Sequence, residues 1–222
     1  MTALLQYQAV LLLRSHRWLP PLLLHAAFVA VGVRPGEPVL DSFGWAAAGL
    51  LPVTAWLVRV CVTNEPPSAR DCAAAVAGPR RVHLAGVLTG LLAAVLLGAA
   101  TTAVVAALGD PRSADHRVDV PLGPAVLAGL VTSVVCALLG TAVGALCNRP
   151  LLRSTAWAVP GTVLVAFAAL LAGGSPARAA VTGLVTGSHS GTAQVPWGAL
   201  ALAACCAAGA TAVACAASGR RD

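Results

Sequence analysis

The chain has 222 residues, of which 58% are hydrophobic and only 10% are charged, and its mean hydropathy is +0.84. This composition excludes a water-soluble domain of ordinary make-up and predicts an all-α, polytopic membrane protein with a single transmembrane domain over residues 1–222. All 14 basic residues are arginines, so the chain has no Walker A phosphate loop, which needs a lysine. The arginines lie at the ends of apolar runs, which indicates membrane topology rather than nucleic-acid binding.

Residues 1–13 predict a short N-terminal helix in the membrane interface, because the stretch is apolar but interrupted by polar side chains. The first positive charges, Arg14 and Arg17, follow the apolar residues, whereas a cleaved signal peptide carries its charge first. Residues 18–33 are the first predicted span, which is short for a hydrocarbon core of about 30 Å. We expect its His25 to pack or to form a hydrogen bond, since no acidic residue occurs in any span to support a proton relay.

A polar, turn-rich link at residues 34–42 precedes the second predicted span, residues 43–62. Pro52 predicts a kink in this span. Arg59 lies about one turn before the end of the span, from where its long side chain can reach the lipid headgroups.

The longest charged interruption between two apolar runs is the stretch TNEPPSARDCAAAVAGPRRVH at residues 63–83. Within it, residues 68–77 predict a surface helix of about three turns. Ser68 is the expected N-cap, and Asp71 is expected in the first turn, where the helix dipole favours a carboxylate. Gly78 and the proline that follows it mark the end of the helix.

Residues 84–108 and 120–147 are the third and fourth predicted spans, and each contains two glycines separated by three residues. These pairs are Gly86 with Gly90, and Gly140 with Gly144. Small residues at this spacing let helix backbones approach closely, so we expect tight packing at these positions.

The link at residues 109–119 contains side chains of the types that bind metals: Asp110, Asp115, His116 and Asp119. Arg112 and Arg117 are interleaved with them. This mixture of charges favours a solvated loop over a metal site.

Residues 154–173 are the fifth predicted span, with a bend at Pro160, and residues 196–218 are the sixth. The segment between them, 174–194, is rich in Gly, Ser and Thr and has two open interpretations: a plain loop, or short segments that dip into the outer membrane surface. The sequence Ser-His-Ser at 188–190 has no acidic residue in this part of the chain to orient the histidine, so we expect no catalytic triad. The seven cysteines lack CxxC spacing and are expected to be small apolar fillers without a structural disulfide.

Six spans place both chain ends on one side of the membrane, and arginines are more numerous on the cytoplasmic side. The side with the termini and residues 63–83 has ten: Arg14, Arg17, Arg59, Arg70, Arg80, Arg81, Arg149, Arg153, Arg220 and Arg221. The other side has four: Arg34, Arg112, Arg117 and Arg178. We therefore predict a multi-pass protein of a bacterial cytoplasmic (inner) membrane with both termini in the cytoplasm.

The layout and two stretches of the sequence resemble a known family. The stretch LLLRSHRWLPP at residues 11–21, and TNEPPSARDCAAAVAG followed by the basic pair Arg80 and Arg81, are similar to permease (membrane) subunits of ABC-2 type exporters, especially small actinobacterial ones. The short N-terminal helix, the six spans and the helix between spans two and three also fit this family.

The resemblance implies a permease that forms the translocation path as a dimer with a second copy or a paralogue. Each permease would couple to a separate ABC ATPase subunit through a cytoplasmic coupling helix. That role falls here on Glu65, Ser68, Arg70, Asp71, Arg80 and Arg81.

ATP and Mg would then bind to the partner ATPase, so this chain itself is expected to hold no cofactor or metal and to be no enzyme. Membrane lipid is the other expected partner. The alternative is a non-transporting membrane anchor or scaffold subunit of a membrane complex.

Overall fold

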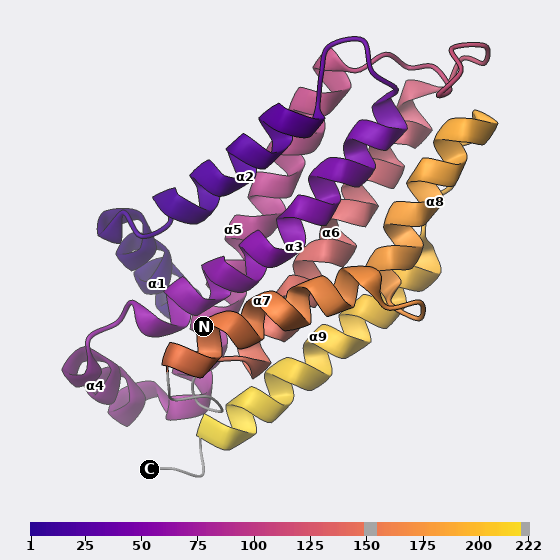
Figure 1. The fold of residues 1–222 in the computed structure, drawn as a ribbon. Helices are drawn as coiled ribbons and strands as arrows, with labels where there is room; N and C mark the ends of the chain where they lie inside the picture. Colours follow the sequence, from indigo (N-terminus) through magenta and orange to yellow (C-terminus); the bar gives the residue numbers. More distant parts are fainter. Residues whose placement is uncertain (149–154, 219–222) are drawn as a thin grey trace.

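The computed structural model describes residues 1–148 and 155–218. Over these residues the chain forms nine α-helices and no named strand, which confirms the all-α prediction (Figure 1). The helices are α1 (Thr2–Ser15), α2 (Leu19–Gly32), α3 (Val39–Thr63), α4 (Pro67–Ala77), α5 (Pro79–Leu108), α6 (Leu122–Leu146), α7 (Thr155–Leu171), α8 (Pro176–Ser190) and α9 (Trp197–Ser218).

Helix α3 is the centre of the bundle, because it packs against α2, α5, α6, α7 and α8 and also touches α1. In the most apolar stretch of α3, and in that of α6, 72% of the residues are buried, against 28% for α5 and 22% for α9. A helix that exposes apolar side chains over most of its surface is suited to lipid. The two inner helices therefore form the core, and α5 and α9 line the outside.

The expected tight glycine packing is confirmed at three of the four positions. A Cβ atom on Gly140 would lie 2.5 Å from the carbonyl oxygen of Leu51, and one on Gly144 would lie 2.8 Å from the Cβ of Val58. A Cβ on Gly90 would lie 2.9 Å from the Cα of Val58. A Cβ on Gly86 would meet its neighbours only at ordinary contact distances, 3.7 Å or more. The glycines thus bring α5 and α6 against α3 within one chain.

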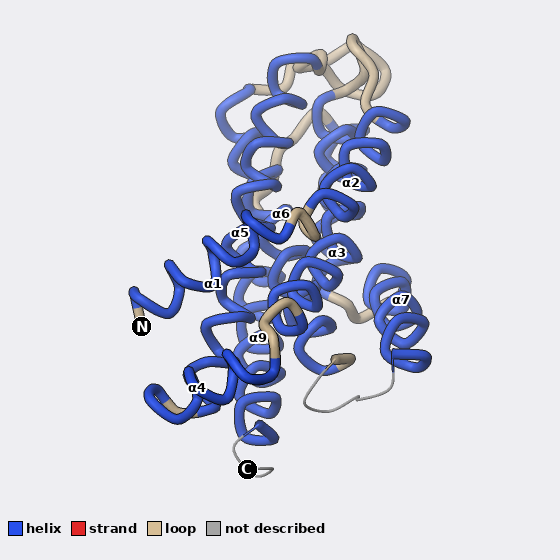
Figure 2. Tube along the Cα trace, turned by 90° about the vertical axis from the view of Figure 1, so that its left-hand side faces the viewer, coloured by secondary structure: helices blue, strands red, loops and turns tan. Residues whose placement is uncertain are grey.

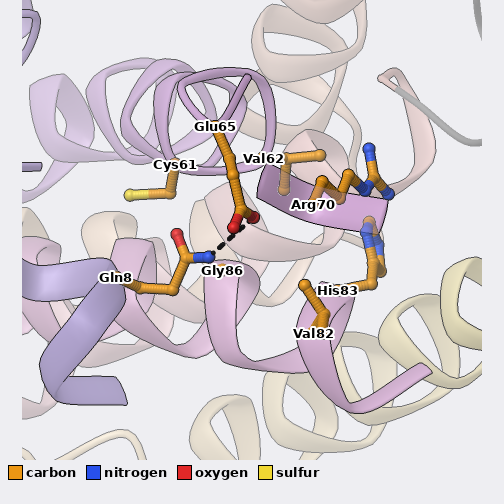
Figure 3. A pocket seen from close by; sticks show the side chains of 8 residues that line it. All are labelled: Gln8, Cys61, Val62, Glu65, Arg70, Val82, His83 and Gly86. Atoms are coloured by element: carbon orange, nitrogen blue, oxygen red, sulfur yellow. Dashed lines mark hydrogen bonds between the residues drawn. The ribbon is translucent and has the colours of Figure 1, made fainter. Parts of the chain in front are cut away.

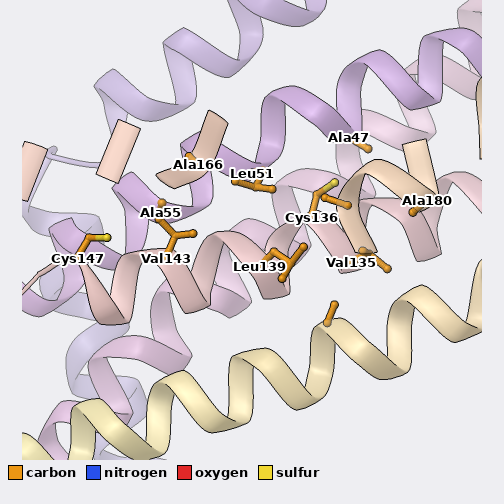
Figure 4. Packing of buried hydrophobic residues seen from close by; sticks show 12 residues of the cluster. Ala47, Leu51, Ala55, Val135, Cys136, Leu139, Val143, Cys147, Ala166 and Ala180 are labelled. Carbon is orange, nitrogen blue, oxygen red and sulfur yellow. The ribbon is translucent and has the colours of Figure 1, made fainter. Parts of the chain in front are cut away.

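The largest buried cluster joins α3 and α6 to α7, α8 and α9 (Figure 4). Its members are Ala47, Leu51, Ala55, Val135, Cys136, Leu139, Val143, Cys147, Ala166, Ala177, Ala180 and Ala203. Most are small, so the backbones can pack closely where lipid supplies no hydrophobic drive. Three of the seven cysteines are buried, and Cys72, Cys205 and Cys206 are exposed.

Helices α2 and α3 are joined by a reciprocal pair of aromatic side chains. The rings of Phe28 and Trp45 stack with their centroids 4.4 Å apart, and Trp45 Nε1 donates a hydrogen bond to the carbonyl oxygen of Phe28 at 2.9 Å. A Cβ atom on Gly49 would overlap Phe28, and one on Gly32 would overlap Trp45. Each helix therefore uses a glycine to receive the aromatic ring of the other.

Helices α3, α5, α6 and α9 are long and apolar enough to cross a membrane. The pair α7–α8, bent by 47°, makes a fifth candidate if it counts as one span, and α2 is apolar but shorter. This count covers the described residues and fits a polytopic helical membrane protein. The predicted spans at 84–108, 120–147 and 196–218 agree with α5, α6 and α9, although α5 begins earlier, at Pro79. Helices α3 and α7 continue through Pro52 and Pro160.

One end of the bundle, which we call the loop end, differs from the sequence prediction in two places. Helix α3 begins at Val39, so Asp41 lies in its first turn and not in a link. Residues 176–190 form one helix, α8, and not a plain loop, while entry of this segment into the membrane stays a prediction. The Ser188 hydroxyl donates to Asp41 Oδ2 at 2.9 Å and ties α8 to α3.

The opposite end, which we call the α4 end, holds α1, α4 and the described end of α9, as both views show (Figures 1 and 2). Of the residues between the fourth and fifth predicted spans, 149–153 lie outside the described residues. Arg149, Arg153, Arg220 and Arg221, which were counted for topology, also lie outside the described residues.

Candidate functional site

Helix α4 projects from the bundle between the ends of α3 and α5. It begins at Pro67, where proline is favoured at the first helical position, and ends before Gly78, whose φ of 86° suits glycine. The predicted end is therefore confirmed. Two predictions about its start are wrong: Ser68 is not the N-cap, which is Pro66, and Asp71 lies beyond the first turn. With proline at the first helical position, the helix begins at Pro67 and its N-cap lies two residues earlier in the chain than predicted.

One face of α4 is exposed along its whole length. Ser68, Asp71, Cys72, Ala75 and Val76 are all exposed, at the spacing of residues on one side of a helix. We call these five residues the α4 outer face. Val76 is 91% exposed, and no residue of α4 is buried. The helix carries small, apolar and acidic side chains to the surface with no neighbour in the described chain to cover them.

Behind α4 lies a small polar pocket, which we call the α4 pocket (Figure 3). It is lined by Gln8, Cys61, Val62, Glu65, Arg70, Val82, His83 and Gly86. These residues come from α1, the end of α3, the link to α4, α4 itself and the start of α5. Gly86 lies close to α3 here, since a Cβ added to it would be 3.7 Å from the carbonyl oxygen of Cys61.

Glu65 is held by α1. Gln8 Nε2 donates a hydrogen bond to Glu65 Oε2 at 3.1 Å, and the neighbouring Asn64 Nδ2 donates to the carbonyl oxygen of Leu11 at 3.2 Å. Partial burial and the nearby Glu65 carboxylate raise the pKa of Tyr7 above its ordinary value. Helix α1 is thereby fixed to the segment that leads into α4.

On the other side of the pocket, Arg70 lies next to His83 (Figure 3). The His83 side chain is only 3% exposed, yet neither of its ring nitrogens has a hydrogen-bond partner in the described residues. Glu65 Oε1 is likewise buried without a partner. Buried polar atoms are nearly always paired in native proteins, often through a bound water.

The dimensions of the pocket limit what it can hold. The space in it that a water-sized sphere can enter is about 10 Å³, which is room for about one water. Sites for drug-sized molecules measure roughly 300–1,000 Å³, so the pocket does not hold an exported molecule.

The ends of α3 and α6 are tied together beside the pocket. Arg59 Nη1 donates to Asn148 Oδ1 at 2.7 Å, and Asn148 Nδ2 donates to the carbonyl oxygen of Gly144 at 2.8 Å. Arg59 therefore does not simply extend toward the headgroups as the sequence suggested. Asn148 is 1% exposed and acts as a buried bridge between the two helices.

The six residues predicted to act together at the coupling site fall into three groups. Ser68 and Asp71 are exposed on α4, and Arg80 and Arg81 are exposed in the first turn of α5. Glu65 and Arg70 are half-buried and line the α4 pocket. The structure thus brings Glu65 and Arg70 around one pocket but places Asp71 on a different surface.

Sequence reasoning missed the contributions of Gln8, His83 and Asn148 to this region. His83 was detectable in principle, as an ionisable residue at the border between a pair of arginines and an uncharged run of 25 residues. The contact of Gln8 with Glu65 joins positions 57 residues apart and has no local signal.

Two other polar groups are candidate sites by sequence. His25 Nε2 forms a hydrogen bond with Thr101 Oγ1 at 3.1 Å, which confirms the expected packing and hydrogen-bonding role. In the loop at 109–119, Arg112 pairs with Asp110 and Asp119, and His116 Nδ1 lies 3.4 Å from Asp110 Oδ2. Among the described residues, no three His, Cys, Asp or Glu side chains converge as metal ligands do.

The serines at 188–190 do not form a triad. Ser188 is buried and donates to Asp41, whereas His189 is exposed at the surface. A serine that donates directly to a carboxylate has no imidazole base between them, so the arrangement lacks the proton acceptor of a hydrolase.

Comparison with known proteins adds no family assignment: no protein-family model, no curated protein and no solved structure matches the chain.

Proposed function

We propose that the chain is the membrane-spanning permease subunit of an ABC-type exporter, which works as a dimer and couples to separate ATPase subunits through α4. The observation that carries this proposal is the α4 outer face. An isolated helix of about 11 residues is marginal in water. A helix of this length with no buried residue gains stability from a partner that covers it, and a coupling ATPase is such a partner.

The arrangement of the helices supports six crossings. Helices α2, α3, α5, α6, α7 and α9 run alternately toward the loop end and the α4 end, which places α1 and the end of α9 on the same side (Figure 1). In this proposal the bent pair α7–α8 makes the fifth crossing. Arg178, at the break between the two helices, is exposed and donates to the carbonyl oxygen of Leu171.

The charges support a cytoplasmic position for the α4 end. Among the described residues, this end has Arg14, Arg17, Arg59, Arg70, Arg80 and Arg81, whereas the loop end has Arg34, Arg112 and Arg117. In bacterial membrane proteins, the side of the protein with more arginine faces the cytoplasm. With α4 in the cytoplasm, its outer face is accessible to an ATPase, and closure of two ATPase subunits on ATP would shift the dimer between two access states.

The test is to search the reading frames next to this gene for an ABC ATPase with a Walker A loop, to co-express that ATPase with this chain, and to purify the pair through a tag on the permease. We expect the ATPase to co-purify and its ATP hydrolysis to change on assembly. Asp71→Arg and Val76→Arg, both on the α4 outer face, should weaken the complex about tenfold or more, because each places a new charge in the contact.

Asp119→Arg is the matched control, since Asp119 has the same charge, its side chain is 92% exposed, and it lies at the loop end. It should leave the complex intact. If both α4 variants fold and still bind the ATPase as well as the unaltered chain does, α4 is not part of the contact. A stable complex that never transports would favour the anchor or scaffold alternative.

A further inference from the structure

We propose that Arg178 and one face of α8 line the export path and select a cargo that carries an anionic group, a carboxylate or a phosphate. The inference rests on the exporter function proposed above and adds the class of its cargo. It is carried by the depth of Arg178 in the bundle, by the lack of an acid to pair with it, and by the polar side chains on the same face of α8.

Arg178 lies at the depth of the membrane core. A Cβ on Gly187 would lie 3.7 Å from Leu40 Cδ1, and a Cβ on Gly44 would lie 3.7 Å from the carbonyl oxygen of Val181. Helix α8 therefore runs beside the first half of α3, and Arg178 is nearer to the middle of α3 than Gly44 is. Gly44 precedes the middle of this 25-residue helix by about 11 Å, at 1.5 Å per residue. Arg178 is thus inside a hydrocarbon core of about 30 Å.

The side chain of Arg178 does not extend to the lipid headgroups at the loop end. Its Nη1 donates to the carbonyl oxygen of Leu171 at 2.6 Å, so the side chain points back to the break between α7 and α8 (Figure 1). Arg178 is nevertheless exposed. A charged side chain at this depth is costly in lipid and faces the inside of a bundle or a water-filled cavity. We infer that this surface faces water between two copies of the chain.

Arg178 has no acidic partner that would neutralise it. The sequence has no Asp or Glu between Asp119 and Asp222, so α7, α8 and α9 contain no acid. Asp41 of α3 accepts a hydrogen bond from Ser188, which lies about 15 Å farther along α8. Within the described residues Arg178 forms no ion pair. An anionic cargo supplies the missing charge, and arginine is well suited to carboxylates and phosphates.

The face of α8 that carries Arg178 is polar up to the loop end. Thr182, Thr186 and His189 are exposed at the spacing of residues on one side of a helix, whereas Leu184 on the opposite side is buried. A polar face of this kind suits water better than lipid. It extends the path from Arg178 to the surface at the loop end.

The test is thiol labelling of the full chain in lipid nanodiscs, which are open to water on both sides. Thr182→Cys is made in a background that has alanine in place of the four cysteines that are not buried: Cys72, Cys205, Cys206 and Cys215. The probes are two methanethiosulfonates, one with a sulfonate and one with a trimethylammonium group. Each rate is divided by the rate of the same reagent with free 2-mercaptoethanol, which removes the difference in intrinsic reactivity.

We expect Thr182→Cys to react with both reagents, and about threefold or more faster with the anionic one on this scale, because Arg178 lies one helical turn away. Leu96→Cys in α5 is the control, since Leu96 is 71% exposed on an apolar helix and should face lipid. It should not react. An unreactive Thr182→Cys in a folded chain, or equal scaled rates of the two reagents, would overturn the proposal.

Arg178→Lys should keep the preference for the anionic reagent, and Arg178→Gln should lose it. The preference should also weaken when salt is raised from about 10 mM to about 1 M, a measurement that leaves Arg178 in place. A preference that survives both Arg178→Gln and high salt would have another origin, and the proposal would be wrong.

The cargo class is tested by protection of Thr182→Cys from the uncharged hydroxyethyl methanethiosulfonate. Octyl phosphate should slow this labelling about threefold or more, whereas octyl glucoside, with the same chain and no charge, should not. Protection by both amphiphiles, or by neither, would contradict an anionic cargo. Co-purification of the ATPase separates this inference from the exporter function: Asp71→Arg should lose the ATPase and keep the labelling pattern, and Arg178→Gln should do the reverse.

Discussion

Replacing Gly140 by alanine tests the close approach of α6 to α3 on which the whole bundle depends. The new Cβ atom would lie 2.5 Å from the carbonyl oxygen of Leu51 and 2.7 Å from the Cβ of Thr54. The nearest of these is a backbone atom, so a side-chain rotation cannot relieve the overlap and the two helices must separate. Overpacking of this kind costs about 1–3 kcal/mol.

The control is Gly209→Ala in α9, where the new Cβ would meet nothing within 4 Å. Both glycines lie inside long helices, and each replacement gains about 1 kcal/mol of helix propensity. That gain cancels in the comparison, so the difference between the variants should equal the overpacking cost of about 1–3 kcal/mol. For a chain of this size it corresponds to a Tm lower by about 2–12 °C in Gly140→Ala.

The assay is thermal unfolding in detergent, followed by the fluorescence of the five tryptophans. Gly86→Ala adds a second comparison, because its new Cβ would meet the Cys61 carbonyl oxygen at an ordinary 3.7 Å. We expect it to behave like Gly209→Ala. If Gly140→Ala unfolds at the same temperature as Gly209→Ala, the close contact of α6 with α3 is not as described.

Tyr7 is the single tyrosine of the chain, so ultraviolet absorbance reports its ionisation alone. We expect its titration midpoint to lie above pH 10. In Glu65→Gln the midpoint should be lower but still raised, because burial is the larger cause of the raised pKa. Because the pKa of Tyr7 is higher in the folded than in the unfolded chain, the contribution of its protonated form to stability is complete below pH 10 and is lost as the pH rises through the folded pKa. An unchanged midpoint in Glu65→Gln would place Tyr7 away from the Glu65 carboxylate. Asn148→Ala should lower the unfolding free energy by about 1–3 kcal/mol, because it leaves Arg59 unpaired. A double-mutant cycle with Arg59→Met should show a coupling of at least about 0.5 kcal/mol. Additive effects would show that the 2.7 Å hydrogen bond between the two side chains contributes nothing.

The positions of the long outer helices could be predicted because they depend on local information. An uncharged run of 25 residues at 84–108 and an apolar run at 196–218 fix α5 and α9 to within a few residues at each end. The earlier start of α5 also has a local reason, since Pro79 is favoured in a first helical turn.

Helix α8 shows both a missed signal and a limit. Ser175 accepts a hydrogen bond from the N–H of Ala177 and precedes Pro176, which together are a readable helix start. The many Gly, Ser and Thr residues nevertheless favoured a loop. Ala177, Ala180 and Leu184 are buried in the bundle, and this burial overrides the weak local propensity.

The candidate site could be predicted only in its chain position. The polar stretch at 63–83 identifies the region and the helix within it. Which side chains turn inward depends on contacts with distant segments, such as Gln8 with Glu65 and Arg59 with Asn148. The separation of Glu65 from Asp71 therefore required the structure.

The reciprocal aromatic contact between α2 and α3 has a consequence for how the chain enters the membrane. With 14 residues, α2 is about 21 Å long, which is less than the hydrocarbon core of about 30 Å. Its insertion as a single helix would be weakly favoured. Phe28 and Trp45, each seated on a glycine of the opposite helix, join it to the 25-residue α3. We expect the two to partition from the translocon together, as a helical hairpin whose second arm carries the first into the bilayer.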